Sequence, residues 1–132
     1  MSAKRILLLG LDEKVAGELA AALTGRSHRV DTHPFLSTRE CIELIEAFGA
    51  DLVCCPAQPL QYGPLVKACQ RNRKKVPVIV VTHQPKVSEW LDALESGASD
   101  YFGPPFEPGH VGWIVDSAAV SAPMASYVSV MH

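Results

Sequence analysis

The chain has 132 residues, of which 48% are hydrophobic and 20% are charged, with a formal net charge of −2 at pH 7. This composition predicts one globular domain and not a disordered chain. The net charge argues against a whole-protein attraction to nucleic acids or anionic membranes, and no apolar run approaches the roughly 18–20 residues of a membrane span. We therefore expect a cytoplasmic protein whose first apolar run is a strand and not a secretory signal.

The first part of the chain shows two strand-helix pairs. Residues 5–10 form a continuous apolar run that ends at a glycine, which is typical of a strand buried on both faces. The helix expected over residues 13–25 has one apolar stripe, and a second strand is expected over residues 28–33. The helix over residues 37–49 opens with Ser37, which is placed to cap it. The stripe of the first helix consists of Val15, Leu19 and Leu23.

Three further pairs follow in the second part of the chain. The predicted strands are residues 51–55, 76–82 and 99–103. The predicted helices are residues 62–74, with a start near Pro64, then 85–97 and 108–121. The residues expected to face inward from helix 85–97 are Val87, Trp90, Leu91 and Leu94. Five strands that alternate with five helices predict a parallel sheet with helices on both faces.

The four cysteines form no C-x-x-C pair and have no histidine pair at zinc-finger spacing. Cys54 and Cys55 are neighbours in an apolar strand, so their side chains should point to opposite faces of the sheet. We interpret the cysteines as small buried hydrophobic residues. A redox sensor that uses Cys55 with His83, at the ends of neighbouring strands, stays open as a less favoured alternative.

Four segments together resemble the receiver domain of bacterial response regulators, over about residues 4–121. These segments are KRILLLGLDEKVAGELAAAL, ADLVCC, VPVIVVT and ALESGASDYFGPPFEP. The resemblance implies the α/β flavodoxin-like (CheY-like) fold: a doubly wound, five-stranded parallel sheet in the order 2-1-3-4-5 with five helices. It implies a receiver-like domain over residues 1–121, followed by residues 122–132 as a tail or the start of a linker to an effector domain.

The phosphorylation site that this resemblance implies is degenerate. In two-component phosphorelays, a receiver accepts a phosphoryl group on an aspartate, with two acids for Mg²⁺, a hydroxyl and a lysine around it. The two acids fall on Gly10 and Leu11, the acceptor on Pro56 and the lysine on Pro104, while the hydroxyl is kept as Thr82. With the alignment shifted by one residue, the acceptor position falls on Cys55, which is not an aspartate either. Mg²⁺ prefers oxygen ligands, which Gly10 and Leu11 do not offer as side chains. We therefore predict no metal, no cofactor, no phosphorylation and no enzymatic activity.

Other features that the resemblance implies are kept. Thr82 and Tyr101 couple the site to the face made by the fourth helix, the fifth strand and the fifth helix. We expect this face to bind a protein partner or a second copy of the chain, with Glu89 and Asp92 on it. The resemblance also implies a cis peptide bond between Pro104 and Pro105, with the Phe106 ring turned back onto the sheet.

The favoured function is regulation by phosphorylation-independent protein contact or dimerisation. An alternative is a small-molecule site in a vacant apolar pocket over Thr82, lined by Gly10, Leu11, Pro56 and Pro104. The basic run at residues 71–75 has no interleaved aromatic residues, so we interpret it as a solvated turn and not as a nucleic-acid site. We expect no membrane partner.

Overall fold

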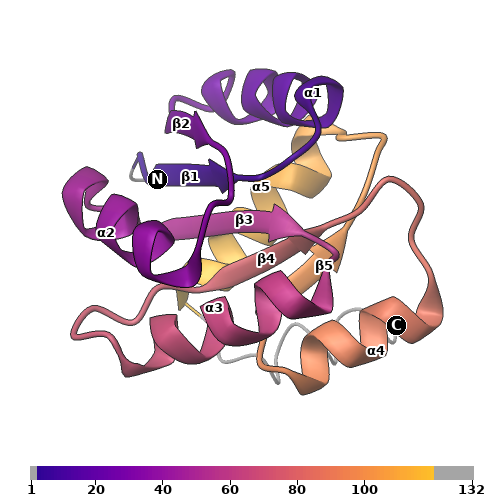
Figure 1. The fold of residues 1–132 in the computed structure, drawn as a ribbon. Helices are drawn as coiled ribbons and strands as arrows, with labels where there is room; N and C mark the ends of the chain where they lie inside the picture. Colours follow the sequence, from indigo (N-terminus) through magenta and orange to yellow (C-terminus); the bar gives the residue numbers. More distant parts are fainter. Residues whose placement is uncertain (1–2, 121–132) are drawn as a thin grey trace.

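The structure is a computed structural model that describes residues 3–120, the side chains of 119–120 excepted (Figure 1). Its parallel sheet has the order β2-β1-β3-β4-β5. The strands are β1 (Arg5–Leu9), β2 (Arg29–His33), β3 (Leu52–Pro56), β4 (Val78–Val81) and β5 (Asp100–Phe102). The helices are α1 (Glu13–Thr24), α2 (Thr38–Phe48), α3 (Pro59–Arg71), α4 (Val87–Glu95) and α5 (Pro108–Val120). The predicted doubly wound fold is thereby confirmed, and the predicted tail over residues 122–132 lies outside the described residues.

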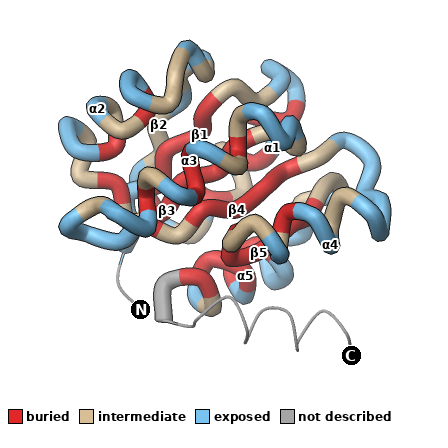
Figure 2. Tube along the Cα trace, turned by 60° about the horizontal axis from the view of Figure 1, so that its bottom comes forward, coloured by how far each residue is buried: buried red, intermediate tan, exposed pale blue. Residues whose placement is uncertain are grey.

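The sheet is the middle one of three layers. Helices α2, α3 and α4 cover one face, and α1 and α5 cover the other (Figure 1). Along β1, Leu7 and Leu9 enter the core under α2, α3 and α4, whereas Ile6 and Leu8 enter the core under α1 and α5. The central strands are therefore buried on both faces, and exposed residues gather on the outer surfaces of the helices (Figure 2).

The four cysteines are all free and buried. Cys55 belongs to the core under α2, α3 and α4, and Cys54 belongs to the core under α1 and α5, so the predicted alternation of these neighbours is confirmed. Burial raises the pKa of the Cys41 thiol to about 11 and that of the Cys69 thiol to about 12. Within the described residues, the cysteines are packed as small hydrophobic side chains.

The first two helices begin where their capping residues predict. The Asp12 carboxylate accepts hydrogen bonds from the backbone N–H groups of Lys14 and Val15, at 3.1 and 3.3 Å. Ser37 Oγ accepts one from the backbone N–H of Glu40, at 3.1 Å, as expected. The apolar stripe predicted for α1 is buried, and Ala16 lies with it. Local sequence therefore explains α1 well.

Helix α3 begins at Pro59, and the predicted start near Pro64 is wrong. Both prolines suit a first turn, where the missing N–H costs no hydrogen bond. The chain uses the earlier proline, and Pro64 lies inside the helix. The earlier start places Tyr62 within α3, where its side chain is buried against the core.

Helix α4 is rotated relative to the predicted orientation. Val87 is 70% exposed and Leu91 is 37% exposed, so the expectation that both face inward is wrong. The only residue of α4 that is fully buried is Ala93, while Trp90 packs against the core at its edge. Ala93 is thus the contact of α4 with the core, and the larger Val87 and Leu91 lie on the outer side of the helix.

Candidate functional site

At the end of β1, the position where the resemblance implies the first acid has no room for a side chain. Gly10 has a φ of +70°, in the left-handed region that favours glycine, and its N–H donates to the carbonyl of His33 at 2.8 Å. A Cβ added at Gly10 would lie 2.6 Å from the Cβ of Phe35. A carboxylate at Gly10 would therefore require Phe35 to move, because real Cβ atoms do not approach so closely.

The acids that follow β1 have other surroundings. Asp12 caps α1 through its carboxylate, and Glu13 is exposed in the first turn of that helix. Leu11 packs against the core under α1 and α5. Among the described residues, no group of three His, Cys, Asp or Glu side chains is placed to hold a metal ion.

The end of β3 offers no nucleophile. Pro56 is half-buried and pairs with Val81 of β4, so it occupies the strand end that the predicted acceptor position requires. Cys55 is fully buried, and burial raises the pKa of its thiol well above the ordinary value. His83, its candidate partner, is exposed. A redox-active cysteine needs a lowered pKa and access, and Cys55 has neither.

The end of β4 carries a polar network that reaches α4. The Tyr101 hydroxyl donates to Glu89 Oε1 at 2.6 Å and accepts from the Lys86 N–H at 3.0 Å. Thr82 Oγ1 lies 3.4 Å from Glu89 Oε1. Burial and the hydrogen bond to Glu89 raise the pKa of Tyr101. The structure thus brings together Thr82, Tyr101 and Glu89, and it places the Tyr101 ring, which is 7% exposed, beneath the first turn of α4.

A second tyrosine anchors α4 from the other side. The Tyr62 hydroxyl on α3 donates to the Asp92 carboxylate on α4. Burial and this hydrogen bond raise the pKa of Tyr62 above its ordinary value. Asp92 and Glu89 are both predicted on the partner face. Their carboxylates instead accept hydrogen bonds from tyrosines within the domain. No local pattern in the sequence signals the role of Tyr62, because its partner Asp92 lies 30 positions away.

The loop after β5 has the predicted backbone conformation but no lysine side chain. The peptide bond between Pro104 and Pro105 is cis, as predicted. The Phe106 ring packs against the core, with its centroid 5.4 Å from that of Phe102 in an edge-to-face arrangement. A Cβ added at Gly103 would lie 2.5 Å from the carbonyl oxygen of Thr82, so the ends of β4 and β5 approach closely. Pro104 offers no charged group at the lysine position.

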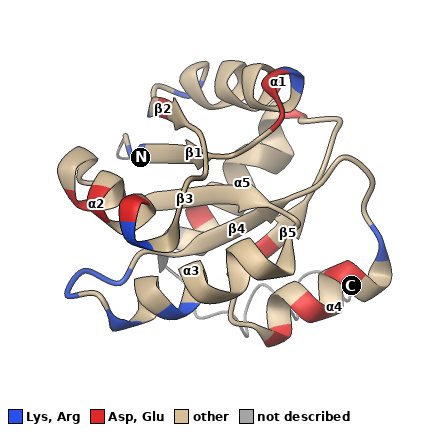
Figure 3. Cartoon of the chain, viewed as in Figure 1, with Lys and Arg blue, Asp and Glu red and all other residues tan. Residues whose placement is uncertain are grey.

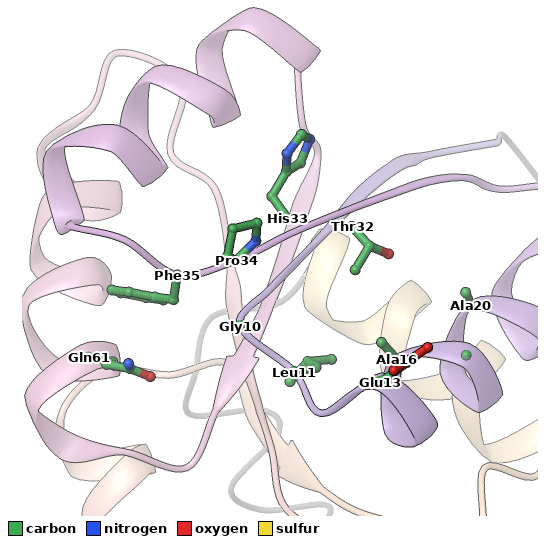
Figure 4. A pocket seen from close by; sticks show the side chains of 11 residues that line it. Gly10, Leu11, Glu13, Ala16, Ala20, Thr32, His33, Pro34, Phe35 and Gln61 are labelled. Atoms are coloured by element: carbon green, nitrogen blue, oxygen red, sulfur yellow. The ribbon is translucent and has the colours of Figure 1, made fainter.

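Two cavities open near these strand ends. The larger one, of about 680 Å³, includes Gly10 and Leu11 and extends along α1 (Figure 4). A smaller one, of about 280 Å³, includes Pro56 and Thr82. Pro104 lines neither of these two. The residues predicted to line one pocket are thus divided between two cavities, and Phe35 also lines the larger one.

Basic side chains gather at the end of α3 and in the following turn, whereas α2 and α4 are mainly acidic (Figure 3). In the turn, the Lys74 ammonium contacts Asp51 Oδ1 at 2.8 Å, and the Arg5 N–H donates to Asp51 Oδ2 at 2.8 Å. Burial opposes ionisation of Asp51, but these hydrogen bonds hold the pKa of its carboxyl below the ordinary value. Lys74 thus has a structural contact within the domain.

No protein-family model matches the chain. The transcriptional regulatory protein TcrA of Mycobacterium tuberculosis is 29% identical over 109 residues, which are 80% of this chain and 42% of TcrA. The chain therefore spans less than half the length of this curated relative.

Solved structures of response regulators are similar to the whole described domain. A response regulator from Chloroflexus aurantiacus J-10-fl is 24% identical with a TM-score of 0.76, over 91% of this chain and 100% of that one. An atypical orphan response regulator, described as revealing a phosphorylation-independent regulatory mechanism, is 22% identical with a TM-score of 0.70, over 89% and 98%. The chain thus has the CheY-like receiver-domain fold of response regulators. None of the helices in residues 3–120 is long and apolar enough to cross a membrane.

Proposed function

We propose that this chain is an atypical receiver domain of bacterial signal transduction, which regulates a protein partner without being phosphorylated and is not an enzyme. The observation that carries the proposal is the packing of Phe35 over Gly10, at the position of the first metal-binding acid. The Cβ and backbone of Phe35 take the space that a side chain at Gly10 would need, so a single substitution would not restore the metal-binding acid. Pro56 and Pro104, which replace the acceptor and the lysine, support the same conclusion.

Chemical phosphorylation tests this proposal. We expect the intact mass of the chain to stay unchanged after incubation with acetyl phosphate and Mg²⁺. The Pro56→Asp variant should also stay unmodified, because its new carboxylate would lack the metal that neutralises charge on the moving phosphoryl group. A hydroxylamine-labile adduct of one phosphoryl group on the unaltered chain would overturn the proposal.

The proposed contact lies on the face formed by α4, β5 and α5. Besides Val87 and Leu91 on α4, Trp113 on α5 is 44% exposed, and these three large apolar side chains are among the exposed ones of the described domain. Aromatic and aliphatic residues of this kind commonly anchor interfaces. The Glu89 and Asp92 carboxylates are engaged within the domain, so their role here is to hold α4 in place behind the contact.

Sedimentation equilibrium of single substitutions tests this face, with a second copy of the chain as the partner. We expect Trp113→Ala to weaken a homodimer by roughly tenfold or more, because a central aromatic anchor contributes more than about 1.4 kcal/mol. Leu60→Ala is the matched control, since Leu60 is 92% exposed on α3, outside the face. A dimer that resists Trp113→Ala and dissociates with Leu60→Ala would show that the face is misassigned.

The longer relative supports a role for this contact in a larger regulator. TcrA is a transcriptional regulatory protein, and the matched segment is 42% of it. We therefore propose that the domain passes its state to an effector region through the α4, β5 and α5 face. This role requires no direct contact between the receiver-like domain and nucleic acid.

A further inference from the structure

The cavity of about 680 Å³ lies at the carboxyl end of the sheet (Figure 4). Gly10 and Leu11 follow β1, while Thr32 and His33 end β2, and all four line the cavity. Gln61 reaches it from α3, on the side away from α1. In doubly wound sheets, ligands bind beyond the carboxyl ends of the strands, and cavities of roughly 300–1,000 Å³ are of the size that holds small molecules.

The wall contributed by α1 is made of short side chains. Ala16, Gly17 and Ala20 line the cavity, and a Cβ added at Gly17 would meet nothing within 4 Å. Elsewhere on the same helix, Val15 and Leu19 fill the space against the sheet. The cavity therefore exists because α1 presents small residues on the one face that looks toward the segment after β2.

One polar atom at the cavity lacks a partner. Gln61 Oε1 is buried and accepts no hydrogen bond from any described residue. In Figure 4 its side chain extends from α3 toward Gly10. The His33 ring, by contrast, already contacts Asp31 Oδ2 through Nε2 at 2.8 Å. Buried acceptors without a donor are rare and costly, so a donor that met this atom after a small shift of the Gln61 side chain into the cavity would be stabilised.

The charges around the cavity exclude an anion. No Lys or Arg lines it, and its one carboxylate, that of Glu13, is exposed in the first turn of α1. A phosphate or carboxylate ligand would find no Lys or Arg, would meet the charge of Glu13, and would compete with Asp31 for the His33 ring. Apolar groups of Leu11, Ala16 and Phe35 make up much of the remaining lining.

We propose that this cavity is a binding site for a small, neutral and mainly apolar molecule whose N–H group donates to Gln61 Oε1. None of the residues that line the cavity belongs to α4, β5 or α5, so the site is separate from the proposed partner face, although α5 packs in the same core as α1. It would give the domain an input that needs no phosphorylation.

Two neutral bicyclic probes test the site on the full chain by two-dimensional NMR. Indole carries one N–H donor, and benzofuran has the same shape with an oxygen in that position. We expect saturable shifts at Gly10, Thr32 and the Gln61 side chain with indole, and roughly threefold to tenfold weaker binding of benzofuran, the range of one net hydrogen bond. In Gln61→Leu the preference for indole should vanish, while both probes still bind.

A filled cavity provides the matched control. Ala20→Phe should abolish the shifts, because Ala20 lines the cavity, whereas Ala21→Phe on the exposed side of the same helix should leave them. Equal binding of the two probes to the unaltered chain would overturn the role of Gln61. Binding that survives Ala20→Phe, or concentration-dependent shifts of the same residues without any probe, would overturn the small-molecule site, the latter in favour of a second copy of the chain.

Discussion

Helices α1 and α4 are attached to the same sheet by different forces. Four residues of α1 are buried, and Asp12 caps its first turn. In α4 only Ala93 is buried, and its capping residue, Lys86, makes no side-chain capping bond. Instead, two tyrosine hydroxyls donate to carboxylates of α4, namely Tyr62 to Asp92 and Tyr101 to Glu89.

The difference teaches which part of the domain is free to change. Burial of apolar area is strong and insensitive to charge, and close packing of the buried side chains resists displacement of a helix. Hydrogen bonds to carboxylates are directional, contribute less, and depend on protonation. Helix α4 is therefore the element whose position other contacts can alter, and it belongs to the proposed partner face.

The largest expected effect is in α1. Leu19→Ala should lower the free energy of unfolding by about 2–5 kcal/mol, because the side chain is 1% exposed and its removal leaves a cavity in the core. Urea unfolding followed by circular dichroism measures this loss. The matched control is Glu18→Ala, an exposed neighbour, for which we expect a change within about 0.5 kcal/mol. A loss below about 1 kcal/mol for Leu19→Ala would contradict the apolar attachment of α1.

A smaller effect is expected in α4. Tyr101→Phe removes a donor to Glu89 and an acceptor for the Lys86 N–H, and should cost about 1.5–3 kcal/mol, as for hydrogen bonds to charged groups. Native-state hydrogen exchange should show faster exchange of α4 amides with little change in α1. A double-mutant cycle with Glu89→Ala isolates the pair. Equal acceleration in both helices would mean that α4 does not open separately.

The sequence predicted α1 well and α4 poorly, for one physical reason. In α1, the periodic residues Val15, Leu19 and Leu23 specify the buried face, and Asp12 specifies the start. The anchors of α4 come from far along the chain, since Tyr62 and Asp92 are 30 positions apart. Apolar periodicity suggested that Val87 faces inward, and no local pattern reveals that a tyrosine on α3 holds the helix in another rotation.

The candidate site also has features that the sequence predicts and one that it does not. The absence of an acid at Gly10 and of a lysine at Pro104 could be read directly from the sequence. That Phe35 occupies the space above Gly10 could not, because this contact joins β1 to the segment after β2 across the sheet edge. The one available signal was an apolar pair, Phe35 and Leu36, between a strand end and the Ser37 cap.

Alkaline pH should loosen α4 before α1. The folded-state pKa values of Tyr62 and Tyr101 are raised above the ordinary 10.0, by burial and by their carboxylate partners. The two hydroxyl groups stabilise the folded state fully at pH values below the pKa of tyrosine in the unfolded chain. This stabilisation is lost as the pH rises through their pKa values in the folded state. At about pH 10.5 the loss should be at most about 1 kcal/mol for each tyrosine. Tyr62→Phe and Tyr101→Phe should flatten the pH dependence of unfolding, and an unchanged slope would contradict the assignment.

The smallest expected effect is a gain in α1. Gly17→Ala should raise the free energy of unfolding by about 0.5–1 kcal/mol, because alanine loses less conformational entropy in a helix and its Cβ would meet nothing within 4 Å. The gain should appear in global urea unfolding, since α1 is attached through the core and unfolds with the whole domain. Gly10→Ala is the opposing control: its Cβ would approach Phe35 at 2.6 Å in a left-handed conformation, and it should destabilise the domain. If Gly17→Ala slowed hydrogen exchange only within α1 and left global unfolding unchanged, α1 would be opening separately, and the contrast with α4 would fail.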